Sequence, residues 1–518
     1  MAHDETAPAR TPAPESAADH ADGPARGPHP EHGDEHDRKD GREHGPGPGP
    51  EHHRGRVHGA GTGAGADGGD DAAGLAERRG LAVRAAVAQG VVDGRRPVAG
   101  LLDVATVRAA ARSLHRAFAE VAAPEHPVRH TFAVKAASLV PVLRLLDEED
   151  IGCEVASPGE LALARAAGVP ASRTVLDSPI KTEDELREAL SAGIALNADN
   201  PQELTRLDAL IGSGSTPTAP LGLRVNPQLG AGAIDAMSTA TSTSKFGVAL
   251  GDPGAREWVL QAYADRPWLT RVHTHTGSQG VSLELMAAGV AAAYELAEEI
   301  NRTVGRQQVD SLDIGGGLPV NFDSDAVDPG FAAYARLLRD RVPGLFDGRY
   351  GLVTEFGRSL LAKAGTVLAR VEYAKSAGGR PIAVTHAGVQ LAVRTVFHSD
   401  SWPLRVFALD AQGRPKEGRP VTQDVAGPCC FAGDLVARGR ELPPLEAGDL
   451  VALADTGAYY FSNPFGYNSL PRPGVHGFRV GGSGSVDFAT VREPQTTESL
   501  VAESGGDLPD ALSGLTEP

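Results

Sequence analysis

Residues 130–166 read HTFAVKAASLVPVLRLLDEEDIGCEVASPGELALARA, and the order of patterns within them points to a fold class. A short β-rich run over 130–136 is followed by a helical pattern over 141–150. A second β-rich run over 152–157 and another helical pattern come next. Strands that alternate with helices are typical of parallel βαβ units, because a parallel connection has to cross over the sheet. These residues therefore predict two such units in succession.

The same alternation continues to about residue 357. The β-rich runs are HTFAVKA (130–136), GCEVAS (152–157), TVLDSP (174–179), GIALNAD (193–199), LGLRVN (221–226), RVHTHTG (271–277), SLDIGGG (311–317) and GLVTEFG (351–357). Eight strand–helix repeats predict an α/β fold with a (β/α)8 barrel, the TIM barrel. A doubly wound open sheet is the main alternative. It fits less well, because no GxGxxG stretch opens a first helix.

The pattern changes after about residue 365. Pieces such as VLARVEYAKSAGGRPIAVTHAG and DLVALADTGAYYF are strand-like, with Gly and Pro turns and no long helices between them. They predict a second, mostly antiparallel β domain over 365–495, after a barrel domain over 126–364. The segment 75–125 precedes the barrel. We expect its strand to join the β domain, and a separate N-terminal subdomain is the alternative.

Both ends of the chain have the composition of disordered tails. Residues 1–74 are rich in Pro, Gly, His and acidic residues, as in GPHPEHGDEHDRKDGREHGPGPGPEHH, and residues 496–518 form the second expected tail. Such segments cannot bury enough apolar surface to offset the entropy of ordering. The His-rich tract has no regular spacing and no cysteine, so we assign no metal site to it.

Composition narrows the class of partner. The net charge of −18 disfavours non-specific nucleic-acid binding, which needs clustered Lys and Arg. The three cysteines, Cys153, Cys429 and Cys430, provide no disulfide framework and suit a reducing compartment. No apolar run approaches the roughly 20 residues that a bilayer span needs, and the N-terminus lacks the basic-then-apolar order of a secretory signal. We therefore expect a cytoplasmic protein that binds a small molecule rather than nucleic acid or membrane.

Polar residues collect at the carboxyl ends of the predicted strands, where barrel enzymes place their active sites. The set comprises Lys135, Glu154, Arg224, His275, Gly315, Gly316, Gly317, Glu355 and Arg358. Consecutive glycines let backbone N–H groups approach an anion, and an arginine adds a two-pronged donor. A lysine can bond an aldehyde, and a carboxylate can hold a ring nitrogen protonated. Each residue alone is a weak signal, but together they suggest a pyridoxal phosphate site.

A set of motifs is spread over about residues 95–480. They are AVKA (133–136), GCEVASPGEL (152–161), SKFGV (244–248), HTHTGSQ (273–279), DIGGGLP (313–319), EFGRS (355–359), GPCCFAGD (427–434) and DTGAYYFSNPFGYNSLPRP (455–473). In combination they resemble the fold-type III pyridoxal-phosphate decarboxylases, the group of diaminopimelate and ornithine decarboxylases. The style of the last two motifs is closest to the diaminopimelate branch.

The resemblance implies a role for each matching residue. Lys135 would bind the cofactor covalently, His275 would lie against its ring, and Glu355 would bond the pyridine nitrogen. Cys430 would enter the site from a partner subunit and assist protonation. The phosphate would be held by Ser278, Gly315, Gly316, Gly317, Arg358 and Tyr467, and the cofactor-binding set also includes Glu154 and Arg224. Lys245 and Asp434 match a pair that bridges subunits in the ornithine enzymes, so a homodimer with shared active sites is expected.

Two positions depart from the family pattern. Phe356 stands in EFGR where the family usually has proline, which should alter backbone stiffness more than chemistry. Phe431 stands where the family places an acid that binds the distal amino group of the substrate. A phenyl ring cannot form that ion pair, although a cation–π contact worth about 0.5–2 kcal/mol is open to it. We expect an altered substrate subsite that includes Arg358, Phe431 and Tyr467.

The function that these residues predict is decarboxylation of an amino acid, similar to that of diaminopimelate decarboxylases, with altered recognition of the distal end. A modified or carrier-bound amino acid is an alternative substrate, and racemisation on the same barrel is an alternative reaction. A non-catalytic, cofactor-binding regulatory homologue is an alternative role. It is disfavoured because Lys135, His275, Glu355 and Cys430 are all present.

Overall fold

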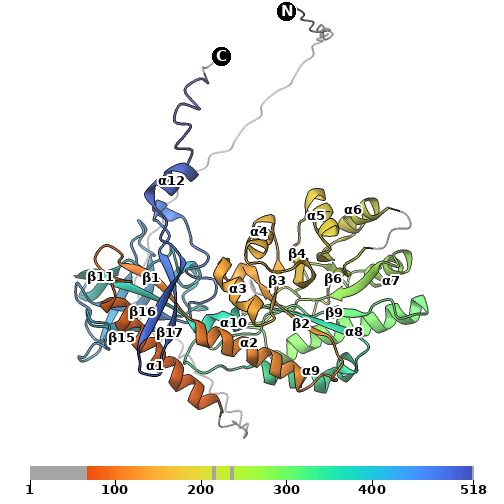
Figure 1. The fold of residues 1–518 in the computed structure, drawn as a ribbon, viewed down its shortest axis with the longest axis horizontal. Coiled ribbons are helices and arrows are strands. Elements are labelled where there is room, and N and C mark those ends of the chain that lie inside the picture. Colours follow the sequence, from red (N-terminus) through yellow and green to blue (C-terminus); the bar gives the residue numbers. More distant parts are fainter. Residues whose placement is uncertain (1–66, 213–216, 234–237, 516–518) are drawn as a thin grey trace, which may run out of the picture. The chain divides into compact units, whose positions relative to one another are not determined.

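The computed structural model describes residues 67–212, 217–233 and 238–515. The expected N-terminal tail lies outside the described residues up to position 66. Two sheets organise the described chain, and Figure 1 shows helices α3 to α9 around the strands of one of them.

The first sheet is a closed barrel of eight parallel strands. They are β2 (Val128–Ala133), β3 (Gly152–Val155), β4 (Thr174–Asp177), β5 (Ala195–Ala198), β6 (Leu221–Asn226), β8 (Leu269–His273), β9 (Ser311–Asp313) and β10 (Gly351–Phe356). The order is β5-β4-β3-β2-β10-β9-β8-β6, and β5 also pairs with β6, which closes the ring. A short β7 (Val248–Ala249) extends the edge of β6. All eight β-rich runs are confirmed as barrel strands.

Helices follow the strands and cover the barrel. They are α3 (Val140–Glu148), α4 (Pro158–Ala166), α5 (Glu183–Ala192), α6 (Pro201–Ile211), α7 (Ala255–Asp265), α8 (Leu283–Val304), α9 (Phe331–Arg341) and α10 (Arg358–Leu361). Local sequence sets their ends. At α5 the Glu185 N–H donates to Thr182 Oγ1 at 3.2 Å while the Thr182 N–H donates to the Glu185 carboxylate at 2.8 Å, and Gly193 ends the helix with φ +68°.

The second sheet is mostly antiparallel and confirms the predicted β domain. Its strands are β1 (Val98–Asp103), β11 (Gly365–Ala377), β12 (Arg380–Thr385), β13 (Val406–Leu409), β14 (Val421–Ala426), β15 (Leu435–Leu442), β16 (Leu450–Ala454), β17 (Gly474–Val480) and β18 (Val486–Arg492). Strand β1 lies between β11 and β17, so the strand of segment 75–125 belongs to this sheet. Helix α2 (Val104–Ala119) of the same segment packs mainly against α9 and α10 of the barrel and also touches β17.

The two ends differ from the expectation of disordered tails. Helix α1 (Asp67–Ala88) begins before residue 74, and its Ala82, Val83 and Ala86 are buried against the second sheet. Helix α12 (Thr497–Glu503) forms within the expected C-terminal tail, where the Thr496 hydroxyl caps it by accepting the Ser499 N–H at 3.1 Å. The tail prediction is therefore wrong over these helices. In α1 the buried face mixes alanine with leucine and valine, and its first turns are rich in glycine and aspartate, which weakens the apolar signal.

None of the described helices combines the length and the apolar composition that crossing a bilayer requires.

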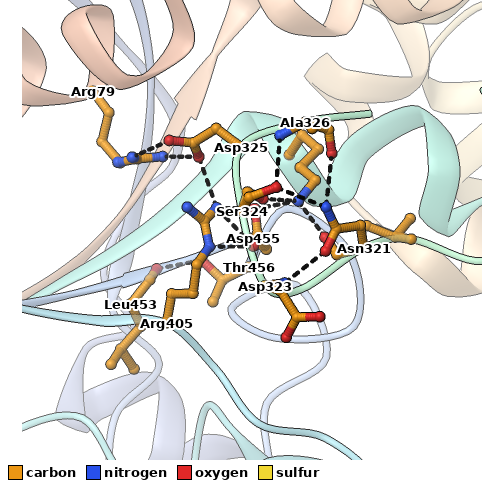
Figure 2. Close-up of polar contacts among 12 residues, drawn as sticks. Arg79, Asn321, Asp323, Ser324, Asp325, Ala326, Arg405, Leu453, Asp455 and Thr456 are labelled. Carbon is orange, nitrogen blue, oxygen red and sulfur yellow. Dashed lines mark hydrogen bonds and ion pairs between the residues drawn. The ribbon is translucent and has the colours of Figure 1, made fainter. Parts of the chain in front are cut away.

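A largely buried charge network joins α1, the loop after β9 and the second sheet (Figure 2). Arg79 forms two hydrogen bonds of 2.7 Å with the carboxylate of Asp325. Arg405 reaches the same carboxylate at 2.7 Å and that of Asp455 at 2.9 Å. Lys363 Nζ lies 3.3 Å from Oδ1 of Asp455. Because Asp455 is fully buried and doubly paired, the network fixes the contact between the barrel and the β domain.

Candidate active site

Lys135 follows strand β2 and faces a cavity at the carboxyl ends of the barrel strands. It lies in the short helix η1 (Val134–Ala136), and its ammonium contacts the carboxylate of Glu154 on β3. The lysine side chain is 47 % exposed, whereas that of Glu154 is 1 % exposed. Burial lowers the pKa of Lys135, but the negative charge of Glu154, helped by Tyr459, raises it by more, so the pKa lies above its ordinary value. The amine is therefore held as a cation beside a buried acid.

The cavity brings together six of the predicted site residues. Its volume is about 310 Å³, and its lining includes the predicted residues Lys135, His275, Ser278, Gly317, Glu355 and Arg358. These residues come from the ends of β2, β8, β9 and β10, which are far apart in sequence and adjacent in the barrel. Their common placement at the carboxyl end of the strands is the arrangement that barrel enzymes use for catalysis.

A chain of ionisable side chains crosses the barrel next to the cavity. Glu355 Oε2 lies 3.6 Å from His273 Nε2, and His273 Nδ1 lies 3.4 Å from Asp177 Oδ1. Arg224 Nη1 reaches Asp177 Oδ2 at 3.2 Å. Burial, followed by the neighbouring carboxylates of Asp313 and Glu154, raises the pKa of Glu355 well above its ordinary value.

The same three residues, Asp177, His273 and Glu355, place potential metal-ligand atoms within 4.8 Å of one another. Burial raises the pKa of Asp177, but His273 and Arg224 lower it by more, so the Asp177 carboxylate is ionised and paired. Because the Arg224 guanidinium already neutralises this carboxylate and the Lys135 ammonium borders the same cavity, the geometry favours an ion-pair chain over a cation site.

The three glycines do not all offer N–H groups to a ligand. The Gly315 N–H donates to Asp313 Oδ1 and the Gly316 N–H donates to His275 Nδ1, both at 3.1 Å. Glycine is required for another reason: a Cβ at Gly316 would lie 2.1 Å from the Glu355 carbonyl oxygen. Only Gly317 lines the cavity, and its N–H has no acceptor among the described residues. The expectation that Gly315 and Gly316 donate to a phosphate is therefore corrected.

His275 has a neutral ring in this arrangement. Its Nδ1 accepts the Gly316 N–H, so the proton of the neutral ring belongs on Nε2. Burial, then the charge of Arg224, lowers the pKa of His275 well below its ordinary value.

Arg358 provides the strongest anion-binding feature of the cavity. It is 4 % exposed, and its Nε and Nη1 atoms are buried without a hydrogen-bond partner among the described residues. Its guanidinium lies 4.6 Å from the ring centre of Trp402 and 4.5 Å from that of Tyr459. Burial lowers its pKa to about 10, so it stays a cation at neutral pH. Unsatisfied buried donors on a cation fit the phosphate of pyridoxal phosphate.

Sequence reasoning missed three residues around Arg358, all from the β domain. Tyr459 and Arg394 line the cavity, and Trp402 stacks on both Arg358 and Arg394. Tyr459 is anchored because its N–H donates to the Ala136 carbonyl oxygen at 2.8 Å. Its motif DTGAYYF carried the resemblance but received no role. The spacing of Arg394 and Trp402 gave no signal, because only the docking of the two domains brings them to the site.

Cys430, Phe431 and Tyr467 lie outside the lining of this cavity. Cys430 is exposed, and its N–H donates to Asn468 Oδ1 at 2.8 Å. Phe431 and Tyr467 belong to an aromatic cluster of four partly exposed rings: Phe397, Phe431, Phe465 and Tyr467. Within this chain, Tyr459 rather than Tyr467 stands beside Arg358, so Tyr467 does not make the predicted phosphate contact inside one chain.

The predicted intersubunit pair is not supported. Asp434 is 3 % exposed, and its carboxylate accepts the N–H groups of Val389 at 2.6 Å and Cys429 at 2.7 Å. Both oxygens are therefore used inside the chain, where they shape the GPCC loop. Lys245 is exposed, with its ammonium 5.0 Å from the ring centre of Phe246.

Phe356 is a core residue. It is fully buried, and its ring centre lies 5.1 Å from that of Phe331 and 6.2 Å from that of Tyr334 on α9. The side chain points to the helices that cover the barrel, away from the cavity side on which its neighbour Glu355 lies.

Comparison with known proteins identifies the family. The profile of the family described as pyridoxal-dependent decarboxylase, pyridoxal binding domain, matches residues 104–362. A diaminopimelate decarboxylase from Pseudomonas aeruginosa is 34 % identical over 369 residues, which cover 70 % of this chain and 84 % of that protein. One from Actinosynnema pretiosum is 33 % identical over 401 residues, 74 % of this chain and 84 % of that protein.

Solved structures agree on the fold. Diaminopimelate decarboxylase from Helicobacter pylori, complexed with L-lysine, superposes with a TM-score of 0.68 at 24 % identity and covers 79 % of this chain and 97 % of that one. The sequence matches extend over more residues than the barrel contains. The chain therefore belongs to the family of pyridoxal-dependent decarboxylases, and its cofactor is pyridoxal phosphate.

Proposed function

We propose that this enzyme decarboxylates an amino acid that resembles diaminopimelate but carries no free ammonium group at its distal end. Two guanidinium groups, Arg358 and Arg394, line one cavity, enough for the cofactor phosphate and a substrate carboxylate. The curated relatives are named diaminopimelate decarboxylases, after a substrate with two carboxylates. The observation that carries the altered distal end is Phe431, which packs in an aromatic cluster where an acid would have to bind an ammonium.

The residues of the cavity divide the work. Pyridoxal phosphate, when bound, withdraws electrons from the substrate α-carbon and so makes loss of CO2 feasible. Lys135 would hold the cofactor covalently, and Glu154 would accept the proton that its ammonium has to lose. Glu355 would keep the pyridine nitrogen protonated. Ser278, the Gly317 N–H and Arg358 would hold the phosphate, and His275 would help to hold the ring.

We take Cys430 of a partner subunit as the donor of the proton that replaces CO2, and Lys135 is the alternative donor. Cys430 is exposed and lies off the cavity of its own chain, next to the partly exposed aromatic cluster. A homodimer in which this surface covers the partner's cavity would supply both the thiol and Phe431 to the site. Exposed aromatic rings that gather in one place are typical of interfaces.

Mixing two inactive variants tests the shared site. Lys135→Ala and Cys430→Ala homodimers, each with little activity, are co-denatured and refolded together, and CO2 release is measured. A mixed dimer has one cavity with both residues intact, so activity should return above that of either variant alone. Control mixtures of each variant with itself should stay inactive. If the mixture is no more active than its parts, each chain builds its own site and the dimer proposal is wrong.

A substrate screen tests the distal end. We expect wild-type CO2 release to be faster from distally acylated or carrier-bound amino acids than from meso-diaminopimelate. Phe431→Glu should raise kcat/KM for meso-diaminopimelate about tenfold or more, because an ion-paired hydrogen bond replaces a phenyl ring.

Tyr373→Glu is the matched control, since it places the same carboxylate on an exposed aromatic position of β11 that is 66 % exposed. This control should leave the ranking of substrates unchanged. Efficient wild-type turnover of meso-diaminopimelate that Phe431→Glu fails to improve would contradict the altered distal site. It would leave decarboxylation itself established.

A further inference from the structure

The opposite, amino-terminal end of the barrel holds a buried arginine. Arg271 lies on β8 on the same face as His273, so both side chains enter the barrel and Arg271 lies closer to the amino end. Gly222 on the neighbouring β6 makes room for it. A Cβ at Gly222 would lie 3.1 Å from the Cβ of Arg271 and 2.4 Å from Asn197 Oδ1. The interior is thus shaped around this guanidinium.

Arg271 is buried without a counter-ion. It is 2 % exposed and its Nε donates to Ser311 Oγ at 3.3 Å. Its Nη1 is buried and has no hydrogen-bond partner among the described residues. The nearby carboxylate of Asp313 is occupied by Asn197 and the Gly315 N–H. Burial lowers the pKa of Arg271, and the charges of the Asp313, Glu355 and Asp310 carboxylates oppose this in part, although none of them forms an ion pair with Arg271 among the described residues. A buried charge without a partner is costly, which points to a ligand of opposite charge.

Two adjoining hollows open onto this guanidinium from the surface. Their volumes are about 240 Å³ and about 450 Å³, and Arg129, Ala195, Arg271 and Val353 line both. The larger hollow also has small residues at its wall, Gly193, Ser311 and Gly351. Glycine, alanine and serine form part of the lining, which leaves space where bulkier side chains usually fill a barrel interior.

The charges around the hollows favour an anion. Arg129, on β2, is exposed at the rim, and its Nη1 donates to the Ser172 carbonyl oxygen at 3.2 Å. A further arginine of the rim, Arg349, is already paired with Asp347 and Glu298. Asp310 is the acid that lines the larger hollow and Asp150 is the acid that lines the smaller one; both are exposed, and Asp150 is already paired with Arg173. Arg129 and Arg271 together therefore exceed the negative charge at the site.

We propose that the amino-terminal end of the barrel binds a phosphate group between Arg271 and Arg129. The two guanidinium groups come from different strands, β8 and β2, and approach the hollows from different sides. A carboxylate has two coplanar oxygens that match one guanidinium fork, whereas a tetrahedral phosphate can accept hydrogen bonds from two forks at once. This site lies at the other end of the strands from Lys135, so it is separate from the cofactor phosphate site.

Calorimetric titration of the holoenzyme with inorganic phosphate tests this proposal. The cofactor must be bound, because its own phosphate then blocks the Arg358 site. Ionic strength is held constant, and acetate and glycerol 3-phosphate are titrated in parallel. We expect saturable binding of phosphate at one site per chain and weaker binding of acetate. Tighter binding of glycerol 3-phosphate than of inorganic phosphate would identify a phosphomonoester as the ligand.

Two variants and one control locate the site. Arg271→Gln and Arg129→Gln should each weaken phosphate binding about tenfold or more, the loss expected for a charge-assisted hydrogen bond. Arg129 is exposed, so its variant should fold even if Arg271→Gln does not. Arg336→Gln, at an exposed arginine of α9, should bind phosphate as the wild type does. The absence of saturable binding, acetate binding as tight as phosphate binding, or affinity unchanged in Arg129→Gln would overturn the proposal.

Discussion

Lys135→Ala is expected to abolish turnover. CO2 release should fall by more than about a thousandfold, because the residue that bonds the cofactor is lost and no second amine replaces it. The substitution also leaves the buried Glu154 carboxylate without its ion-pair partner, which costs stability in addition to activity. The measurements are initial rates of CO2 release and the visible absorption of the protein with pyridoxal phosphate.

Covalent labelling makes this prediction specific to one position. Borohydride reduction followed by peptide mapping should place the cofactor on the peptide that contains Lys135 in the wild type and on none in the variant. Lys375→Ala is the matched control, since Lys375 is an exposed lysine of β11 far from the cavity lining. It should retain wild-type labelling and rate. A labelled Lys135→Ala protein would refute the assignment of the anchor.

Glu355→Gln should lower kcat about a hundredfold or more, because glutamine cannot hold the pyridine nitrogen protonated through a negative charge. Glu355 is 5 % exposed and lines the cavity, so no solvent group can take its place. Glu257→Gln, at an exposed position of α7, is the matched control and should leave kcat unchanged.

Although Glu355→Gln should lower kcat, it should raise the stability of the cofactor-free protein. The pKa of Glu355 is raised by burial first and then by nearby carboxylates, so the folded chain holds this proton more tightly than the unfolded chain does. The folded protein then loses stability as the pH rises above the ordinary value of 4.5 toward the raised one. Glutamine removes this loss.

Melting of the cofactor-free proteins measures the effect. At neutral pH, Glu355→Gln without cofactor should melt at a higher temperature than cofactor-free wild type, and the difference should vanish well below pH 4.5. Equal melting temperatures across this pH range would mean that Glu355 is not destabilised by its surroundings. In that case Glu355 would not be a buried, destabilised carboxylate that a protonated pyridine nitrogen stabilises.

The strands could be predicted because each barrel strand is a short apolar run bounded by turn residues, and these runs recur in order. The residue at the end of such a run, Lys135 or Glu355, is then placed by the topology alone. Tyr459 and Trp402 could not be placed in this way. They reach Arg358 only because the β domain docks on the barrel, and no local pattern encodes that contact. The predicted phosphate contacts of Gly315 and Gly316 are wrong for a similar reason. Their N–H groups donate to Asp313 and His275, and no local pattern shows those contacts.

The roles assigned to Asp434 and Tyr467 show the limit of matching by motif. Both residues occupy the expected sequence positions, but the two carboxylate oxygens of Asp434 accept hydrogen bonds from the backbone N–H groups of Val389 and Cys429 in the same chain. Tyr467 packs in the aromatic cluster beside Phe431 and Phe465. A motif fixes where a residue stands along the chain, whereas its contacts depend on the elements that pack around it.

The network of Arg79, Asp325, Arg405 and Asp455 has a consequence for dissecting this protein. Asp325 belongs to the barrel, and its two partners come from the N-terminal helix and the β domain. A fragment that ended at residue 364 would leave Asp325 with only one of these partners. It would also lack Trp402 and Tyr459, the two aromatic rings that lie against the Arg358 guanidinium. The smallest piece able to turn over substrate therefore has to run from helix α1 through Tyr459, although the cofactor anchor lies in the barrel alone.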